Sequence, residues 1–334
     1  MSKTILTLSK KDLFYESNRE KFRYLIAQGI DGFRLNLAKF SESELYSIFN
    51  SVLDLINKNN LHNFIFVFDI PYPKRKARIV SLPNGRMALR KNDIIKLKST
   101  KSSIDKSDCD IVFVDQNNIE IEIGKTIFFA DGEGAFECVS INGGIIHLKA
   151  LNDFSIYKGK SLSLGIINSN DNELLKNVCQ ELKTIVENYY FALSFVENEK
   201  EIKSFCHDIN CDSQKILSKI ETEKGIRNIN EILRCSEGVI LGRGDLYFYS
   251  NPNKFFSNCV NIVNQTIKLG KNFYLCTDIL PSLLNGCIAK RSDLIDISFF
   301  KSCGCENFIL SAGFSESCNI KHAIKIIEES EILL

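Results

Sequence analysis

A lysine and a glutamate two residues apart, Lys219 and Glu221, close a short apolar run, and Asp245 closes a second run further along the chain. Residues two apart on a β-strand project from the same face, so Lys219 and Glu221 should point the same way. One strand–helix–strand period separates them from Asp245, which places the three side chains at the carboxyl ends of neighbouring strands. Two carboxylates can hold a divalent metal, and an ammonium can contact a phosphate. The spacing therefore predicts a site that combines both.

The elements that would position these side chains recur along the whole chain. Eight apolar, β-rich runs lie at residues 4–8, 32–37, 64–70, 190–195, 215–220, 238–241, 273–277 and 308–311. Amphipathic segments separate most of them, for example at 43–58, 173–187, 255–269 and 321–329. Strands that alternate with helices form parallel βαβ units, and eight such units close a barrel. The expected fold class is α/β, a (β/α)8 TIM barrel.

One interval between the third and fourth runs is far longer than a barrel crossover requires. It contains alternating segments at 94–98, 110–114, 119–123, 126–129, 134–140 and 144–151, with a hairpin signal at Asn142-Gly143-Gly144. We therefore expect an inserted all-β domain after strand 3. The barrel should comprise residues 1–73 and 164–334, and the insertion residues 74–163. Because insertions of this kind lie on the catalytic face of a barrel, this one can act as a lid.

The composition argues against some classes of binding partner. Lys and Arg number 42 against 41 Asp and Glu, so the chain has no global field for nucleic acid or a membrane surface. It contains no apolar run of 18 residues, and Met-Ser-Lys-Thr at the start lacks the apolar core of a signal peptide, so a cytoplasmic protein is expected. The 12 cysteines form no paired Cys-x2-Cys set and are interpreted as reduced thiols in the core.

These motifs resemble those of the pyruvate kinase family, and the resemblance extends along the chain with the parts in the same order. That family carries a catalytic lysine and a metal-binding glutamate in a Lys-x-Glu pair, matched here by Lys219 and Glu221. Its second metal carboxylate is matched by Asp245, in Arg243-Gly-Asp. The resemblance implies a pyruvate kinase-like phosphotransferase, which moves a phosphoryl group from phosphoenolpyruvate to ADP with Mg²⁺ or Mn²⁺. Such chemistry depends mainly on charge neutralisation and alignment.

Other positions around the substrate also match the family. Arg34, in Phe33-Arg-Leu-Asn36, corresponds to an arginine that binds the transferring phosphate. Gly244 and Asp245 correspond to residues whose backbone amides hold the substrate carboxylate, and Thr277 corresponds to a threonine beside the enolate. The resemblance thus implies Lys219, Arg34 and Thr277 as catalytic residues.

In the inserted segment, Asp131 and Lys158, each followed by glycine, resemble lid residues on the nucleotide side. Most departures from the family pattern lie elsewhere: Glu197 replaces an arginine, and Tyr247 and Tyr249 replace a glycine and a glutamate. The stretches at 287–290 and 311–314 replace Thr-Arg-Ala-Glu and Ser-Gly-Glu-Thr. The chain ends at Leu334, so the regulatory C-terminal domain of many members is expected to be absent.

The family's monovalent-cation site is only partly matched. Asn36 and Asp69 remain, but Ala38 and Ile70 occupy two positions where the family has side-chain oxygens. Lys74 replaces a glutamate found in potassium-dependent members, and in members that work without potassium a lysine ammonium stands in for the ion. The resemblance therefore implies that K⁺ is not required.

Two other functions fit the same residues. A barrel lyase could use Mg²⁺ to stabilise a pyruvate enolate while a C–C bond breaks, although Lys219 and a lid are not needed for that chemistry. A non-catalytic relative could bind phosphoenolpyruvate or a protein partner, although it would have no need to keep buried charges together. The residues leave open which nucleotide diphosphate or other acceptor receives the phosphate, and whether a homo-oligomer forms through the barrel.

Overall fold

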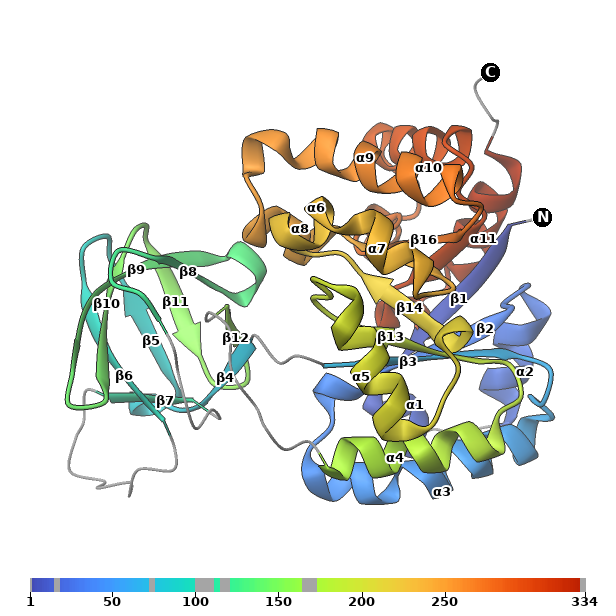
Figure 1. Ribbon diagram of the computed structural model, residues 1–334, viewed down its shortest axis with the longest axis horizontal. Coiled ribbons are helices and arrows are strands. Elements are labelled where there is room, and N and C mark those ends of the chain that lie inside the picture. Colours follow the sequence, from blue (N-terminus) through green and yellow to red (C-terminus); the bar gives the residue numbers. More distant parts are fainter. Residues whose placement is uncertain are drawn as a thin grey trace. The chain divides into compact units, whose positions relative to one another are not determined.

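The computed structural model describes residues 2–14, 19–71, 76–99, 111–114, 121–163 and 173–330. The chain divides into two compact units, Met1–Tyr72 with Asn172–Leu334, and Pro73–Asp171 (Figure 1). The predicted boundaries at residues 73 and 164 remain predictions, because both fall in stretches outside the described residues. In the described part of the chain, no helix is both long enough and apolar enough to span a lipid bilayer.

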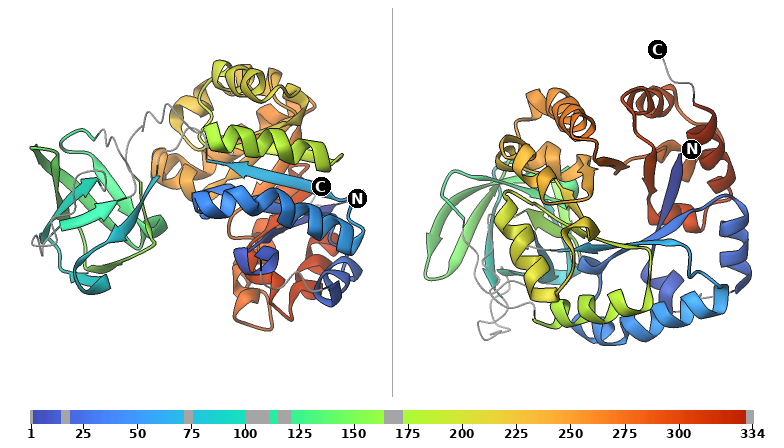
Figure 2. Two further views of the ribbon diagram at one scale, coloured as in Figure 1. Left: turned by 90° about the horizontal axis from the view of Figure 1, so that it is seen from below. Right: turned by 45° about the vertical axis from the view of Figure 1, so that its right-hand side comes forward.

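The first unit is built on a closed barrel of eight parallel strands (Figure 2). Around the barrel the strands follow the order β1-β17-β16-β15-β14-β13-β3-β2, and every neighbouring pair is parallel. Their bounds are β1 Lys3–Leu8, β2 Gly32–Asn36, β3 Ile65–Ile70, β13 Tyr189–Leu193, β14 Ile216–Lys219, β15 Gly238–Gly242, β16 Asn272–Cys276 and β17 Asn307–Leu310. Each predicted run overlaps one of these strands, so the α/β barrel prediction is confirmed.

Helices surround the strands. They are α1 Lys10–Phe14, α2 Arg19–Ala27, α3 Glu42–Asn59, α4 Glu173–Ile185, α5 Glu199–Ile209, α6 Glu223–Arg227, α7 Ile229–Arg234, α8 Arg243–Tyr249, α9 Phe255–Lys268, α10 Arg291–Ser302 and α11 Ile320–Glu329. Helix α3 shows why such segments form. It opens with a reciprocal capping box between Ser41 and Glu44 and ends at Asn60 in the left-handed conformation, while a periodic apolar face is buried.

The barrel interior explains where the charged residues meet. Its packed layer consists of Ile5, Val67, Ala192, Leu217, Ile240, Tyr274, Cys276 and Ile309. Alternate residues of a strand share one face, so the next inward positions toward the carboxyl ends are Thr7, Asp69, Ser194, Lys219 and Gly242. An apolar plug therefore closes the barrel, and polar groups lie directly above it.

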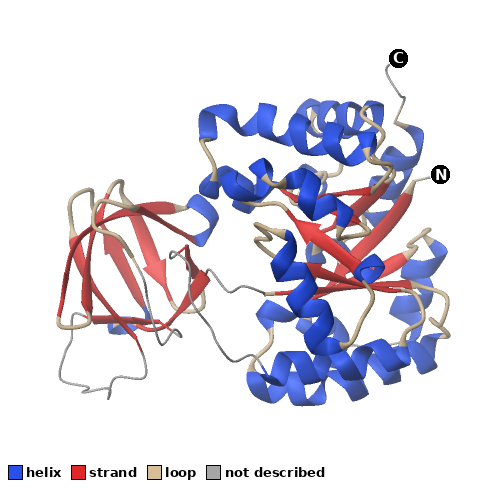
Figure 3. Cartoon of the chain, viewed as in Figure 1, coloured by secondary structure: helices blue, strands red, loops and turns tan. Residues whose placement is uncertain are grey.

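The second unit is built almost entirely of strands (Figure 3). Seven strands close a small barrel in the order β10-β6-β7-β4-β12-β8-β9, and β11 pairs with β5. Their bounds are β4 Lys76–Ser81, β5 Arg86–Leu89, β6 Ile94–Ser99, β7 Ile111–Val114, β8 Thr126–Phe129, β9 Gly134–Asn142, β10 Ile145–Ala150, β11 Phe154–Tyr157 and β12 Ser161–Ser163. Its own core includes Phe129, Phe136 and Leu148.

Comparison with the predicted strands of this unit is mixed. The hairpin at β9 and β10 is confirmed, and its turn is Gly143-Gly144, both at positive φ, with Asn142 paired to Ile145. The strand predicted at 119–123 is wrong in its described part, because Ile121–Ile123 forms no strand. The sequence pattern also missed β4, β5, β11 and β12. Strands β5, β11 and β12 are only three or four residues long. Strand β4 pairs with β12, and β5 pairs with β11, which in both cases lies far along the chain. Local alternation therefore gives a weak signal for these strands.

Candidate active site

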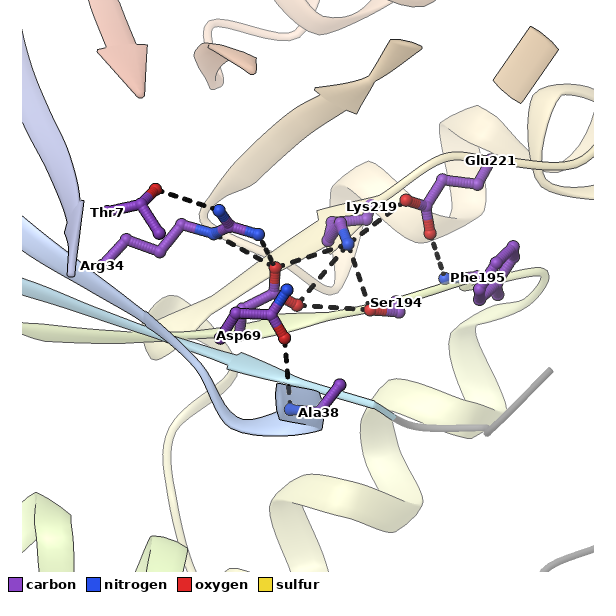
Figure 4. Close-up of polar contacts among 9 residues, drawn as sticks. Thr7, Arg34, Ala38, Asp69, Ser194, Phe195, Lys219 and Glu221 are labelled. Atoms are coloured by element: carbon purple, nitrogen blue, oxygen red, sulfur yellow. Dashed lines mark hydrogen bonds and ion pairs between the residues drawn. The ribbon is translucent and has the colours of Figure 1, made fainter. Parts of the chain in front are cut away.

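Four charged side chains, none more than 12% exposed, lie together at the carboxyl ends of the barrel strands (Figure 4). Arg34 donates from Nε to Asp69 Oδ2 at 3.1 Å, and its Nη2 forms an ion pair with the same oxygen. Lys219 Nζ lies 3.4 Å from Asp69 Oδ2 and 3.2 Å from Glu221 Oε1. The Lys219 and Glu221 side chains are 11% and 1% exposed. Two cations and two carboxylates therefore form a group with no net formal charge.

Mutual attraction keeps three of these groups ionised despite their burial. Burial alone would raise the pKa of Asp69, but Lys219 and Arg34 lower it below the ordinary value. Burial alone would lower the pKa of Lys219, but Asp69 and then Glu221 raise it. The pKa of Arg34 is likewise raised, chiefly by Asp69 against the effect of burial. The charged forms of Arg34 and Lys219 are therefore stable at the floor of the site.

Two hydroxyl groups orient the charges. The Arg34 Nη1 group donates to Thr7 Oγ1 at 3.0 Å. Ser194 Oγ donates to Asp69 Oδ1 at 3.2 Å and accepts from Lys219 Nζ at 3.1 Å. Neither hydroxyl was among the predicted site residues. The alternation rule could have found them, since Thr7 and Ser194 lie two residues beyond Ile5 and Ala192 of the interior layer.

The backbone shapes the surroundings of the Glu221 carboxylate on two sides. The Phe195 N–H donates to Glu221 Oε2 at 2.8 Å, and Phe195 takes the left-handed conformation with a φ of 55°. Such a φ is unusual for an aromatic residue and marks a backbone held in place by its surroundings. On the other side, a Cβ at Gly242 would lie 2.5 Å from Glu221 Oε1, so only glycine leaves room for this oxygen.

The donor set of Glu221 and Asp245 fits a hard divalent cation. Burial raises the pKa of Glu221, and the nearby Asp245 raises it further, while Lys219 acts in the opposite direction. A divalent cation would relieve this strain between neighbouring carboxyl groups. Within the described ranges, no cluster of three or more acidic, histidine or cysteine side chains could hold a metal. A two-carboxylate site suits Mg²⁺, which usually retains waters and binds substrate oxygens as well.

Thr277 and Gly244 lie against each other at the next two strand ends. A Cβ at Gly244 would lie 3.2 Å from Thr277 Cγ2, so the small residue permits the approach. Gly244 and Asp245 belong to the first turn of α8, where N–H groups have no carbonyl partner inside the helix. The structure thus brings Thr277, Gly244 and Asp245 to the face that carries Lys219.

The remaining predicted site residues have other surroundings. Asn36 Oδ1 accepts the Ala38 N–H at 3.1 Å and caps a short 3-10 helix, Leu37–Lys39. Lys74 lies outside the described residues. In the second unit, the backbone of Asp131 belongs to a 3-10 helix, and the Lys158 N–H donates to Gly85 O at 3.4 Å.

Two departures from the family pattern pack near the site. Tyr249 places its ring edge-on to Phe195, with 5.0 Å between ring centroids, and so packs against the residue that holds Glu221. Glu197, which is buried, accepts a hydrogen bond from Thr222 Oγ1 at 3.0 Å and pairs with Lys224 at 3.3 Å. Both substitutions therefore support the segment around Glu221.

A parallel (β/α)8 barrel with buried, paired charges at its carboxyl ends belongs to a well-populated class of enzyme folds. Residues 2–320 match the family model for the pyruvate kinase barrel domain. The chain therefore belongs to the pyruvate kinase family, and the predicted family resemblance is confirmed.

Curated relatives agree with this assignment. The chain is 25% identical to a pyruvate kinase of Thermotoga maritima over 93% of its own length and 66% of the relative's. It is 29% identical to one of Methanocaldococcus jannaschii over 80% and 56% of the two lengths. For one of Thermoplasma acidophilum the identity is 30% over 57% and 35%. The chain thus spans between about one third and two thirds of these relatives' lengths.

Proposed function

We propose that this chain transfers a phosphoryl group from phosphoenolpyruvate to ADP, giving pyruvate and ATP. The observation that carries the proposal is the neutral buried group of Arg34, Asp69, Lys219 and Glu221 above the apolar plug of the barrel. Phosphoryl transfer requires fixed positive charge at the phosphate oxygens and little covalent help. Preorganised cations in a site with little water supply that charge without reorganisation.

Each residue has a distinct role in this proposal. The planar guanidinium of Arg34 binds phosphate oxygens, and the Lys219 ammonium neutralises charge on the phosphoryl group during its transfer. Asp69 keeps both cations in position before substrate arrives. The N–H groups of Gly244 and Asp245 hold the substrate carboxylate, and Thr277 lies beside the enolate.

Glu221 and Asp245 would hold the divalent ion, Mg²⁺ or Mn²⁺. When bound there, it would neutralise charge on phosphate and enolate oxygens. The protein orients the Glu221 carboxylate with the hydrogen bond from the Phe195 N–H. Gly242, which has no side chain, leaves room for the second carboxylate oxygen. In the second unit, Asp131 and Lys158 are proposed to contact the nucleotide, with this unit acting as a lid that excludes water.

A coupled spectrophotometric assay tests the proposal. The protein is mixed with phosphoenolpyruvate, Mg²⁺ and a panel of nucleoside diphosphates, and pyruvate release is followed through a dehydrogenase. Turnover that depends on both the diphosphate and the protein is expected, and omission of each component is the control. Binding of phosphoenolpyruvate without turnover by any diphosphate would instead identify a non-catalytic relative. Pyruvate release without a diphosphate would favour a lyase or phosphatase.

Removing either proposed metal ligand should weaken metal binding. Glu221→Gln and Asp245→Asn each replace an anionic oxygen in a two-carboxylate site, and Mg²⁺ depends on such charge. We expect the Mn²⁺ dissociation constant, followed by water proton relaxation, to rise by at least ~10-fold in each variant. Glu223→Gln, an exposed neighbour, serves as the control and should bind Mn²⁺ as the wild type does. Unchanged Mn²⁺ affinity in both variants would remove these residues from the metal site.

The wild-type protein should not need potassium. Asp69 already contacts two protein cations and Ser194, and Ala38 and Ile70 offer no side-chain oxygen for an ion. We propose that Lys74 supplies the remaining positive charge. Full activity is therefore expected with tetramethylammonium as the sole monovalent cation, and Lys74→Glu should lower activity without full rescue by K⁺. Strong activation of the wild type by K⁺ would contradict this reading, because a complete cation site would then exist.

A further inference from the structure

The loop after β16 has an unusual backbone conformation at Thr277. Thr277, Asp278 and Leu280 all take positive φ values, 70°, 52° and 50°. Positive φ is rare for residues other than glycine and is a marked outlier for a β-branched residue such as threonine. Such conformations persist only where surrounding contacts impose them, and they often occur at functional sites.

The Arg243 side chain contacts the backbone of this loop directly. Its Nε donates to the carbonyl oxygen of Thr277 at 3.1 Å, and its Nη2 donates to the same oxygen. Nη2 also donates to the carbonyl oxygen of Asp278 at 3.2 Å. A guanidinium group presents its N–H donors in a fixed plane, so one arginine can bind consecutive carbonyls in a set geometry.

Arg243 is itself held on its other side. Its Nη1 lies 2.6 Å from both carboxylate oxygens of Asp296 on α10, and its guanidinium lies 5.4 Å from the centre of the Phe300 ring. The Arg243 side chain is 12% exposed. The charged pair is thus largely shielded from water, and an ion pair of this kind fixes geometry more firmly than an exposed one.

The position of Arg243 in the chain links these contacts to the site. Arg243 directly precedes Gly244 and Asp245, and Gly244 lies against the Thr277 methyl group. The same side chain therefore sets the distance between the first turn of α8 and the loop after β16. A shift of Arg243 would move Thr277 relative to both neighbouring residues.

We propose that Arg243 and Asp296 are positioning residues that hold Thr277 against Gly244 and so fix the wall of the site that faces the enolate. The expected effect on kcat rests on the proposed phosphoryl transfer. The expected effect on the position of Thr277 does not depend on which reaction the protein catalyses. Thr277 would act on the substrate, whereas Arg243 and Asp296 would act only through the backbone of Thr277.

The test uses Asp296→Asn, Asp296→Glu and Arg243→Lys, with Asp208→Asn as the matched control. Asp208 pairs with Lys176 at 2.6 Å and is 26% exposed, close to the 2.6 Å and 27% of Asp296, but it joins α4 to α5 away from the site. For Asp296→Asn and Arg243→Lys we expect kcat to fall by about 10- to 100-fold, because small misplacements near reacting atoms cost this much. The KM for phosphoenolpyruvate should change less than kcat, and Asp296→Glu should recover part of the loss.

A second kinetic measurement separates positioning from general stability. Exchange of pyruvate methyl hydrogens with deuterated water, followed by NMR, reports proton transfer at the carbon of the enolate. It should fall in parallel with kcat in Asp296→Asn and remain at the wild-type rate in Asp208→Asn. A kcat that is unchanged in folded Asp296→Asn, or lowered equally in Asp208→Asn, overturns the proposal.

A structural measurement keeps the inference independent of the proposed reaction. The methyl resonance of Thr277, assigned by Thr277→Ser, should shift in Asp296→Asn and stay in place in Asp208→Asn. An unshifted resonance in Asp296→Asn overturns the positioning role whatever the protein catalyses. A wild type without turnover overturns the proposed function, and the methyl resonance then still decides the role of Arg243 and Asp296. If Arg243→Lys does not fold, the two Asp296 variants carry the test.

Discussion

Lys219→Met is expected to lower kcat for phosphoryl transfer by at least ~10²-fold, because it removes a preorganised charge from the position where the phosphoryl group moves. Lys219 is held by Asp69, Glu221 and Ser194, so its ammonium is in place before substrate binds. Methionine has a similar length and no charge, which limits the change to electrostatics. Binding of phosphoenolpyruvate should persist, since Arg34 and the first turn of α8 remain.

Single-turnover kinetics and calorimetric binding of phosphoenolpyruvate measure the two expectations separately. Lys215→Met provides the control, because Lys215 directly precedes β14 and its ammonium contacts the Glu187 carbonyl and the Tyr189 ring. This variant should keep the wild-type kcat. Activity near the wild-type value in Lys219→Met would remove Lys219 from the mechanism.

Asp69→Asn is expected to have the largest effect on stability. The change leaves two buried cations, Arg34 and Lys219, without the carboxylate that both contact. Breaking a buried ion pair by removal of one partner costs about 3–5 kcal/mol of unfolding free energy. We expect a loss in this range, together with a large loss of activity, because neither cation would keep its position.

Denaturant unfolding measures this change, and Asp12→Asn is the matched control. Asp12 is also a buried aspartate, and it pairs with Lys21. It should cost less stability and leave kcat near the wild-type value. Adding Lys219→Met to Asp69→Asn should recover part of the lost stability, because the double variant restores the charge balance of the group, with one cation, Arg34, and one carboxylate, Glu221. A double variant no more stable than Asp69→Asn would show that Lys219 and Asp69 are not coupled.

The pH dependence of stability follows from the lowered pKa of Asp69. A carboxyl group with a lower pKa in the folded state stabilises the fold above its unfolded pKa, and this stabilisation is lost as the pH falls through the folded pKa. The ordinary value for aspartate is 3.8, and that of folded Asp69 is lower. The stability gap between the wild type and Asp69→Asn should therefore be full near neutral pH and shrink in acid below that value.

Much of the barrel and part of the site were predictable from the sequence because they depend on local rules. Alternating strand and helix patterns predict the barrel, and a spacing of two residues places Lys219 and Glu221 on one side, where their charged atoms lie 3.2 Å apart. The family motifs also indicated Arg34, Asp245 and Thr277, and the structure brings these residues to the same face of the barrel.

Contacts between distant segments were decided by the tertiary structure. Asp69 was predicted only as part of a cation site, yet it joins Arg34 to Lys219 across strands β2, β3 and β14. Ser194 was not singled out, and Arg243 was noted only as part of the Arg-Gly-Asp motif, because a hydroxyl or an arginine acquires a role only from the groups that surround it. The short strands β5 and β12 were missed for the same reason, since β5 pairs with β11 and β12 pairs with β4, more than 60 residues away in each case. The periodic pattern of apolar residues depends only on residues that are close together in the sequence. Hydrogen bonds and ion pairs between strands form only when the chain has folded into the barrel.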